Sequence, residues 1–352
     1  MDRRQLLSGL GALGLSARSW ADAPASTVRN VVLVRFGGGV RRRESIAPDT
    51  SWSRYLLHEL LPQGTLFDAM DMGTGREIQT SHGQGTLFLL TGRYYDYARE
   101  QGRPGGEEHY RSPFPTLLEL VRASGAAEHE VIVLNGENRP QEEHFTFSQH
   151  PDFGPAFRAS LLSRRGFDAW RASGSRTDTP VDAFWAAWQA YWGDAPDAGT
   201  LHPRGDRLLT ELALWSLRVL KPRFLMINYN DCDYVHWGNP EHYRRGVAIM
   251  DHGLRQIVEA LDRDPSYRDD TLLVVAPDCG RDDNRLVSLP FQHHFGDRSS
   301  REVFAFFRGP GIPRGVRIDR PTQQVDVMPT IAAQLGLPRA EAEGRALEEV
   351  WG

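Results

Sequence analysis

The sequence predicts an α/β fold with a mostly parallel central sheet sandwiched between helices. Short segments that are apolar throughout and rich in β-branched residues recur along the chain, and amphipathic helical segments separate them. Strands that are apolar on both faces are typical of parallel sheets covered by helices on both sides. The 352 residues are enough for a single domain of this kind with a sizeable core.

Five strands are expected, in chain order, at 30–34, 131–134, 224–228, 272–276 and 303–307. Helices are expected between them, at 115–123, 208–220 and 243–261. The last of these is the clearest, because its apolar residues recur at helical spacing: Val247, Met250, Leu254, Ile257, Val258 and Leu261.

An insertion at about 135–200 breaks this rhythm. Its first part is polar and contains His144 and His150, and its second part contains four tryptophans. We expect the insertion to lie over the strand ends. Two readings are equally favoured for the tryptophans, a lid over a ligand site and a helix that packs them into the core: Trp170, Trp185, Trp188 and Trp192.

The first 23 residues have the three-part layout of an export signal. Arg3 and Arg4 form a twin-arginine pair, an apolar stretch follows at 6–15, and small residues at 21–23 provide a cleavage site. We therefore expect residues 24–352 to form a mature single domain in the periplasm or outside the cell. The apolar stretch is too short to span a membrane, so no stable anchor is expected after cleavage. An ordinary amphipathic first helix is the alternative.

Composition argues against a polyanionic partner. The net charge is −5, and the adjacent Arg41, Arg42 and Arg43 are too few to form the broad basic face of a nucleic-acid-binding protein. We read these arginines as a solvated loop. The two cysteines, Cys232 and Cys279, exclude a scaffold held together by disulfides.

Metal-ligand residue types gather beside three of the expected strands. In a parallel α/β sheet, ligands bind beyond the carboxyl ends of the strands. Asp231, Asp233 and His236 follow the strand at 224–228, Asp278 follows the strand at 272–276, and His293 and His294 precede the strand at 303–307. Carboxylate and imidazole groups suit zinc or manganese. Each of these loops alone is weak evidence for a metal site, and the prediction depends on finding all three, in this order, beside strands.

These loops resemble those of the superfamily that contains alkaline phosphatases and sulfatases. In that superfamily one loop places an Asp a few residues before His-x-Gly, as Asp233 stands before His236 and Gly238 here. The resemblance covers most of 30–105 and 205–340. Asp278-Cys279-Gly280 stands where the family has Asp-His-Gly, and Thr80–Arg93 is similar to the family's nucleophile segment. The other segments that carry the resemblance are His294, Gly309–Ile312 and Val325–Ile331.

The resemblance implies an incomplete two-metal site. One metal would be held by Asp233, His236 and His294. The second normally takes an Asp after the first strand, where this chain has Gly37, and the Asp of an Asp-His pair. That pair is Asp278 and Cys279 here, and Cys279 is a substitute ligand because zinc accepts sulfur. We expect one or two ions, zinc first, with manganese and calcium as alternatives.

The family's nucleophile position falls on Thr80, Ser81 and His82. Thr80 or Ser81 is the expected nucleophile, and His82 a base or a donor to the substrate. Arg281 and Arg93 are candidates to contact anionic oxygens, although each is more typical of a surface or helix-end arginine.

The resemblance thus implies a metal-dependent hydrolase of small anionic phosphate or sulfate esters. Two alternatives remain: a catalytically degenerate binding protein on the same scaffold, favoured by Gly37 and Cys279, and an unrelated flavodoxin-like domain.

The two cysteines each stand next to an expected metal ligand, Asp233 or Asp278. If the strands before them were neighbours, a disulfide would tie the two loops together in an oxidising compartment. Two small buried cysteines that pack as apolar residues are the more common arrangement.

Overall fold

The computed structural model describes residues 27–73, 80–97, 111–136, 145–192, 205–283, 291–293, 296–338 and 341–352. The expected export signal at 1–23, His144 and His294 lie outside these residues. Among the helices that are described, none combines the length and the apolar character needed to cross a bilayer.

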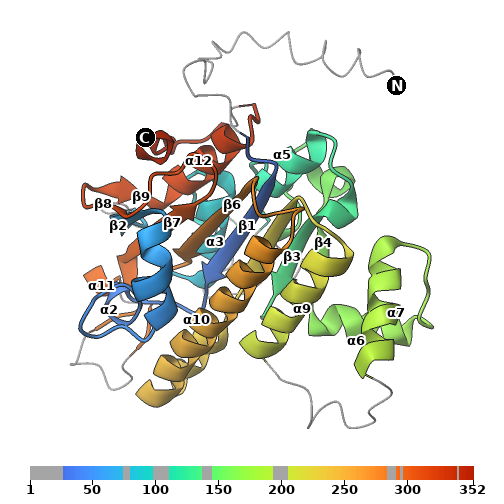
Figure 1. Cartoon of the computed structure of the whole chain (residues 1–352), viewed down its shortest axis with the longest axis horizontal. Coiled ribbons are helices and arrows are strands. Elements are labelled where there is room, and N and C mark those ends of the chain that lie inside the picture. Colours follow the sequence, from blue (N-terminus) through green and yellow to red (C-terminus); the bar gives the residue numbers. More distant parts are fainter. Residues whose placement is uncertain are drawn as a thin grey trace.

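A nine-stranded sheet forms the centre of the molecule, in the order β4-β3-β5-β1-β6-β7-β2-β8, with β9 also paired to β2 (Figure 1). All five expected strands are present: β1 (Asn30–Phe36), β3 (Val131–Asn135), β5 (Phe224–Asn228), β6 (Thr271–Pro277) and β7 (Glu302–Arg308). Four further strands were not expected: β2 (Thr65–Asp71), β4 (Ser160–Leu162), β8 (Val316–Ile318) and β9 (Thr322–Gln323). The predicted fold class, a mostly parallel α/β sheet, is confirmed.

The direction of β7 decides which loops meet. The strands β4, β3, β5, β1 and β6 are parallel to one another, whereas β7 runs antiparallel to both β6 and β2. The residues that precede β7 therefore lie at the same edge of the sheet as the residues that follow β1, β5 and β6. This is why a histidine before one strand can meet carboxylates that come after others.

Helices cover both faces of the sheet. One face carries α3 (His82–Thr91), α5 (Leu117–Ala123) and α12 (Val327–Gln334), and the other carries α9 (Asp206–Val219) and α10 (Pro240–Arg263), which cross in front of the sheet in Figure 1. Side chains of β1 alternate between the two cores, as strand geometry requires: Val31 and Leu33 face the first, Val32 and Val34 the second. Burial on both faces explains the unbroken apolar strands.

Local sequence signals set where these helices begin. Asn239 accepts a hydrogen bond from the N–H of Glu241, and Pro240 occupies the first position of α10. Thr116 and Glu119 form a capping box at the start of α5. The expected helices therefore appear with ends shifted by a few residues at most.

The insertion contains two helices, α6 (Arg164–Ala172) and α7 (Pro180–Trp192), beside α9 at the β4 side of the sheet (Figure 1). Trp170, Trp185 and Trp188 are 6%, 3% and 3% exposed and belong to the core on the α9 and α10 face. Of the two readings of the tryptophans, packing into the core is the one that holds for these three.

The three adjacent arginines are not a solvated loop. They lead into the short helix α2 (Arg42–Ser45), and each is paired with acidic groups of the fold. Arg41 bonds to Glu44 and lies 3.1 Å from Asp283, and Arg42 pairs with Asp68. These charges are therefore compensated within the fold.

Candidate metal centre

The loop after β5 positions the first two site residues. It forms the 3-10 helix η6 (Asp231–Trp237), which Gly238 ends with a φ of 82°. Residues three apart share a face in a 3-10 helix, because it has three residues per turn. Asp233 and His236 have this spacing, and His236 Nε2 lies 2.8 Å from Asp233 Oδ1. The three-residue spacing of Asp233 and His236 thus suits this helix type.

A buried carboxylate at the start of α9 holds this loop in place. Asp206 accepts hydrogen bonds from the backbone N–H groups of Asn230 and Asp231, at 2.8 and 2.9 Å. Asp231 in turn accepts one from the N–H of Asp206, at 3.1 Å. Burial, and then the neighbouring charge of Asp231, raise the pKa of Asp206 well above its ordinary value.

The loop after β6 supplies Asp278, which is fully buried. Its Oδ1 accepts from the backbone N–H groups of Cys279 (2.7 Å) and Gly39 (3.2 Å). Its Oδ2 lies 3.0 Å from His82 Nδ1 and 3.3 Å from Arg35 Nη1. Burial alone would raise the pKa of Asp278, but His82 and Arg35 outweigh it and lower the pKa below the usual value.

His82 joins the two loops. It is the first residue of α3, after Ser81, whose side chain caps the helix by accepting from the N–H of Gln84 at 3.3 Å. Its Nδ1 faces Asp278, and its Nε2 lies 2.8 Å from Asp233 Oδ1. Burial opposes the charged form of His82, but the two carboxylates raise its pKa well above the ordinary value. Since both ring nitrogens contact carboxylates, the structure gives no support to His82 as a free base.

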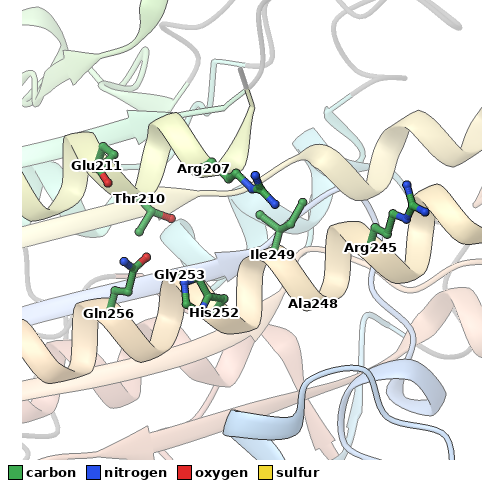
Figure 2. Close-up of a pocket in the computed structure, with 9 residues that line it drawn as sticks. All are labelled: Arg207, Thr210, Glu211, Arg245, Ala248, Ile249, His252, Gly253 and Gln256. Atoms are coloured by element: carbon green, nitrogen blue, oxygen red, sulfur yellow. The ribbon is translucent and has the colours of Figure 1, made fainter. Parts of the chain in front are cut away.

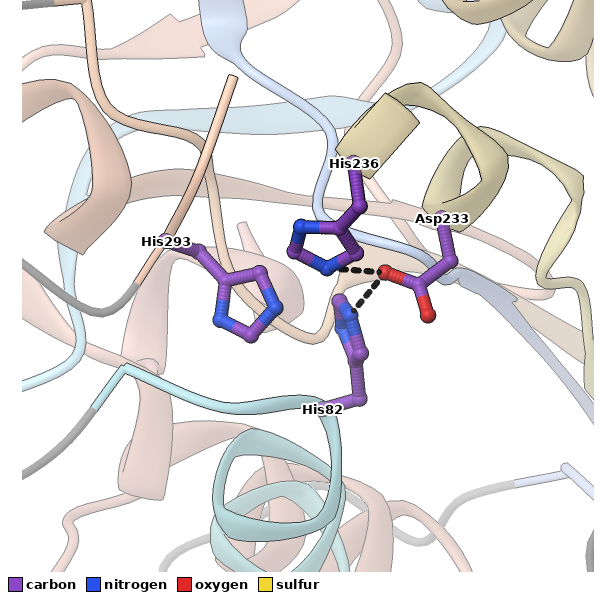
Figure 3. Close-up of side chains that lie close together, drawn as sticks. All are labelled: His82, Asp233, His236 and His293. Carbon is purple, nitrogen blue, oxygen red and sulfur yellow. Dashed lines mark hydrogen bonds and ion pairs between the residues drawn. The ribbon is translucent and has the colours of Figure 1, made fainter. Parts of the chain in front are cut away.

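Four ligand-type residues converge at this edge of the sheet: His82, Asp233, His236 and His293 (Figure 3). One ligand atom from each lies within 4.8 Å of every other. The rings of His82 and His293 have centroids 4.3 Å apart, and those of His236 and His293 5.0 Å apart. The third ligand expected from the sequence was His294, which lies outside the described residues; the structure places the adjacent His293 in the group, and adds His82, which was expected as a base or a donor.

The hydrogen bonds of the three imidazoles fit a metal site. Each Nδ1 has an oxygen partner: Asp278 Oδ2 for His82 at 3.0 Å, Gln292 Oε1 for His236 at 2.8 Å, and the Thr80 carbonyl for His293. In the neutral form that binds a metal, each ring donates its Nδ1–H in this way and keeps the lone pair on Nε2. Without a metal the two carboxylates favour the protonated form of His82, so a cation at this site would replace that proton. Histidines that bind metals in proteins usually have such an oxygen partner on the other nitrogen. Three imidazoles and one carboxylate are a donor set typical of zinc.

The second expected metal position is less complete. Its ligand group is His82, Asp278 and Cys279, with Cys279 Sγ 3.5 Å from His82 Nδ1. A neutral imidazole has one lone pair, so His82 cannot serve both groups at once. Burial, and then Asp278, raise the pKa of Cys279 to about 11, which keeps the thiol protonated. Within the described residues, Glu44, Asp282 and Asp283 belong to neither group.

The disulfide considered from the sequence is absent. Cys232 and Cys279 are both free and buried. The more common arrangement, two small buried cysteines that pack as apolar residues, is the one found. The assumption that the strands before the two cysteines are neighbours was wrong, because β1 lies between β5 and β6 and pairs with both. The two cysteines pack in separate cores, one on each face of the sheet.

One buried arginine completes the centre. Arg281 is fully buried and donates to Asp233 Oδ1 at 2.6 Å, to the Gly38 carbonyl at 2.8 Å and to the Phe291 carbonyl. Its role is therefore to fix Asp233 and the surrounding loops. Arg93, the other candidate, follows the far end of α3 and donates to the Glu341 carbonyl, so it is a helix-end arginine.

A separate groove lies between α9 and α10, with a volume of about 750 Å³ (Figure 2). None of its lining residues belongs to the metal group: Arg207, Thr210, Glu211, Arg245, Ala248, Ile249, His252, Gly253 and Gln256.

Comparisons with known proteins agree with this architecture. No family model matches the chain. A stretch of 96 residues, 27% of this chain, is 31% identical to a protein named Sulfatase from Formosa agariphila, and the match spans only 18% of that protein.

Solved structures match over much more of the chain. A member of the alkaline phosphatase superfamily from Vibrio parahaemolyticus has a TM-score of 0.58 and 15% identity, over 98% of this chain and 78% of that one. A 2-O GAG sulfatase has a TM-score of 0.59 and 15% identity, over 92% and 74%. A variant of the alkaline phosphatase PafA has a TM-score of 0.58 and 11% identity, over 94% and 99%. The chain has the alkaline phosphatase fold, and the resemblance to the alkaline phosphatase–sulfatase superfamily that its sequence indicates is confirmed at the level of the fold.

Proposed function

We propose that this protein hydrolyses small phosphate or sulfate esters with a divalent cation held by His82, Asp233, His236 and His293. The observation that carries the proposal is the convergence of three imidazoles and one carboxylate at the ligand-binding edge of this fold. Solved structures with the same fold include proteins named as a sulfatase, an alkaline phosphatase and a phosphonate monoester hydrolase, which supports the reaction class. Zinc suits the donor set best, and manganese and calcium are the alternatives.

The residues of the centre have separate tasks in this proposal. A divalent cation at such a site supplies Lewis-acid polarisation of the ester oxygens. Asp278 orients His82 through its Nδ1, and Arg281 fixes Asp233. The N-terminus of α3 adds partial positive charge from its backbone N–H groups, which favours binding of an anionic ester beside Ser81.

Of the two hydroxyl groups considered as nucleophile, we favour Ser81. Thr80 is 1% exposed, and its hydroxyl donates to the carbonyl of His293. Ser81 is partly exposed and stands at the N-terminus of α3. A serine hydroxyl is a weak nucleophile until a base or metal activates it, so this assignment depends on the metal centre next to it.

A set of Ser81 variants separates the nucleophile from the helix cap. Ser81→Asn keeps a side-chain oxygen for the N–H of Gln84 but has no hydroxyl, whereas Ser81→Ala loses both. We expect both variants to lose on the order of 10³-fold or more in hydrolysis of p-nitrophenyl phosphate or sulfate. Only Ser81→Ala should also lose about 1 kcal/mol of stability in urea unfolding. Ser81→Asn with the wild-type rate would exclude Ser81 and leave water as the nucleophile.

A catalytically degenerate binding protein is the second candidate. It is favoured by the arginines, since Arg35 lies 3.3 Å from Asp278 and Arg281 donates to Asp233, so both central carboxylates already have a protein cation. On this reading the chain would bind anionic esters without turnover. Titration calorimetry with phosphate, sulfate and sulfated oligosaccharides, beside a hydrolysis screen of the same compounds, distinguishes the two: binding without any product supports the second candidate.

We also propose export by the twin-arginine route, on the basis of Arg3, Arg4 and the small residues at 21–23. Expressed in a bacterium with this pathway, the protein should accumulate outside the cytoplasm, and mass spectrometry should find a mature N-terminus near Pro24. It should be released without detergent. The double variant Arg3→Lys, Arg4→Lys should stay in the cytoplasm at full length; export of that variant would point to another route.

A further inference from the structure

Arg35 is an arginine near the carboxyl end of an otherwise apolar strand. It belongs to β1, the central strand of the sheet, and its side chain is fully buried. The guanidinium group lies on the side of the metal centre: Nη1 is 3.3 Å from Asp278 Oδ2 and bonds to the hydroxyl of Thr86, and Nη2 is 3.4 Å from the carbonyl of Tyr229. A buried, permanently charged group of this kind requires a partner charge, and Asp278 provides it.

The backbone two residues later leaves no room for a side chain. A Cβ atom built on Gly37 would lie 1.9 Å from the carbonyl oxygen of Tyr229, and 2.6 and 2.9 Å from Nη2 and Nε of Arg35. Gly37 is the position where the sequence lacks the expected acidic ligand. An acidic side chain could not be accommodated at position 37, because the carbonyl of Tyr229 and the guanidinium of Arg35 occupy the space next to it.

We infer that Arg35 takes the place of a second cation, so that the centre binds one ion and Asp278 acts as an orienting partner of His82 instead of a ligand. This inference rests on the proposed metal centre and states how many ions it holds. The positive charge that Asp278 needs is supplied by Arg35 at 3.3 Å. A dication in the same pocket would be strongly repelled by a guanidinium that cannot lose its proton, since burial weakens screening by water. Arg281 also touches Asp233 in the first group, but there three imidazoles add ligands that offset the repulsion, whereas the second position has only Asp278 and Cys279 once His82 serves the first.

One consequence can be measured without following catalysis. If the charge of Arg35 excludes the second ion, then removing that charge should let Asp278 and Cys279 bind one. Sulfur and carboxylate ligands both accept zinc or cobalt, and Cys279 Sγ and Asp278 belong to one ligand group within 4.8 Å. Cobalt(II) is the better probe, because a cobalt–thiolate bond produces a charge-transfer band in the near ultraviolet.

The experiment compares wild type with Arg35→Gln and Arg35→Lys after removal of metals and loading with excess cobalt(II). Glutamine keeps hydrogen-bonding capacity toward Thr86 without the charge, and lysine keeps the charge. We expect Arg35→Gln to bind one equivalent more cobalt than wild type by mass-spectrometric metal analysis, and to gain the sulfur–cobalt band. Arg35→Lys should match wild type, and Arg35→Gln combined with Cys279→Ser should lack the band.

Two results would overturn the inference: a sulfur–cobalt band in wild-type protein, or equal cobalt content in folded wild type and Arg35→Gln. The first needs no variant, so the inference stays falsifiable if Arg35→Gln folds poorly; the thermal midpoint of that variant, with and without cobalt, reports its folding. If wild type binds no cobalt at all, the proposed metal centre is contradicted. The role of Arg35 is still decided in that case, by whether Arg35→Gln binds more cobalt than wild type.

Discussion

Replacing Asp233 with asparagine should remove the bound cation and reduce kcat/KM for ester hydrolysis by on the order of 10³-fold or more. Its Oδ1 is the point where the centre converges, with His82 Nε2 and His236 Nε2 each at 2.8 Å and Arg281 Nη2 at 2.6 Å. Asparagine has nearly the same shape but no charge, so both the attraction for a dication and the partner charge of Arg281 are lost. Metal analysis of the purified variant and hydrolysis rates test this.

Asp231→Asn is the matched control. Asp231 lies on the same helix η6 two residues earlier, but its carboxylate accepts from the N–H of Asp206 and it is not in the metal group. An asparagine there still offers an oxygen, so we expect metal content and activity close to wild type. His236→Ala should lose the metal as Asp233→Asn does. Retention of a full equivalent of metal in both Asp233→Asn and His236→Ala would mean that the ion binds elsewhere or that the site is not a metal site.

The strands that the sequence predicts are those buried on both faces. The central strands β1, β3, β5, β6 and β7 read as continuous apolar runs because helices cover both sides of them. The strand β2 was missed because Asp68 interrupts its pattern, and the structure explains that residue: Arg317 Nε donates to it at 2.7 Å. The strands β4, β8 and β9 have only two or three residues, too few to show a period.

The part of the site in which one loop carries two ligands was predictable from the sequence. The part formed by residues from different strands was harder to predict. Asp233 and His236 come from one loop, so their spacing is visible in the sequence. Whether His293 or its neighbour faces the centre depends on the turn before β7. Arg35 was missed because sequence does not show that an arginine in an apolar strand is buried against a carboxylate 243 positions away.

The second large effect is expected at Asp206, a positioning residue that does not touch the metal group. Asp206→Ala leaves two partly buried backbone N–H groups, of Asn230 and Asp231, without their acceptor. We expect a loss of about 2–4 kcal/mol in the free energy of unfolding. These N–H groups lie at the start of the loop that carries Asp233 and His236, so the loop should be held less firmly in the variant. The metal affinity of the folded variant should therefore also fall, by about 10–100-fold, as for other residues that orient ligands. Urea unfolding and a competition titration with a zinc chelator measure the two effects.

Asp206→Asn and Asp182→Ala complete the series. Asparagine retains one acceptor oxygen and should fall between wild type and Asp206→Ala in both stability and metal affinity. Asp182 accepts from the backbone N–H of Thr179 at 3.0 Å in the first turn of α7, so it is a helix-start carboxylate outside the metal group. Its loss should cost about 0.5–1 kcal/mol and leave metal affinity unchanged. If Asp206→Ala loses stability while its folded fraction binds zinc as tightly as wild type, then Asp206 stabilises the fold alone, and the position of the loop does not depend on it.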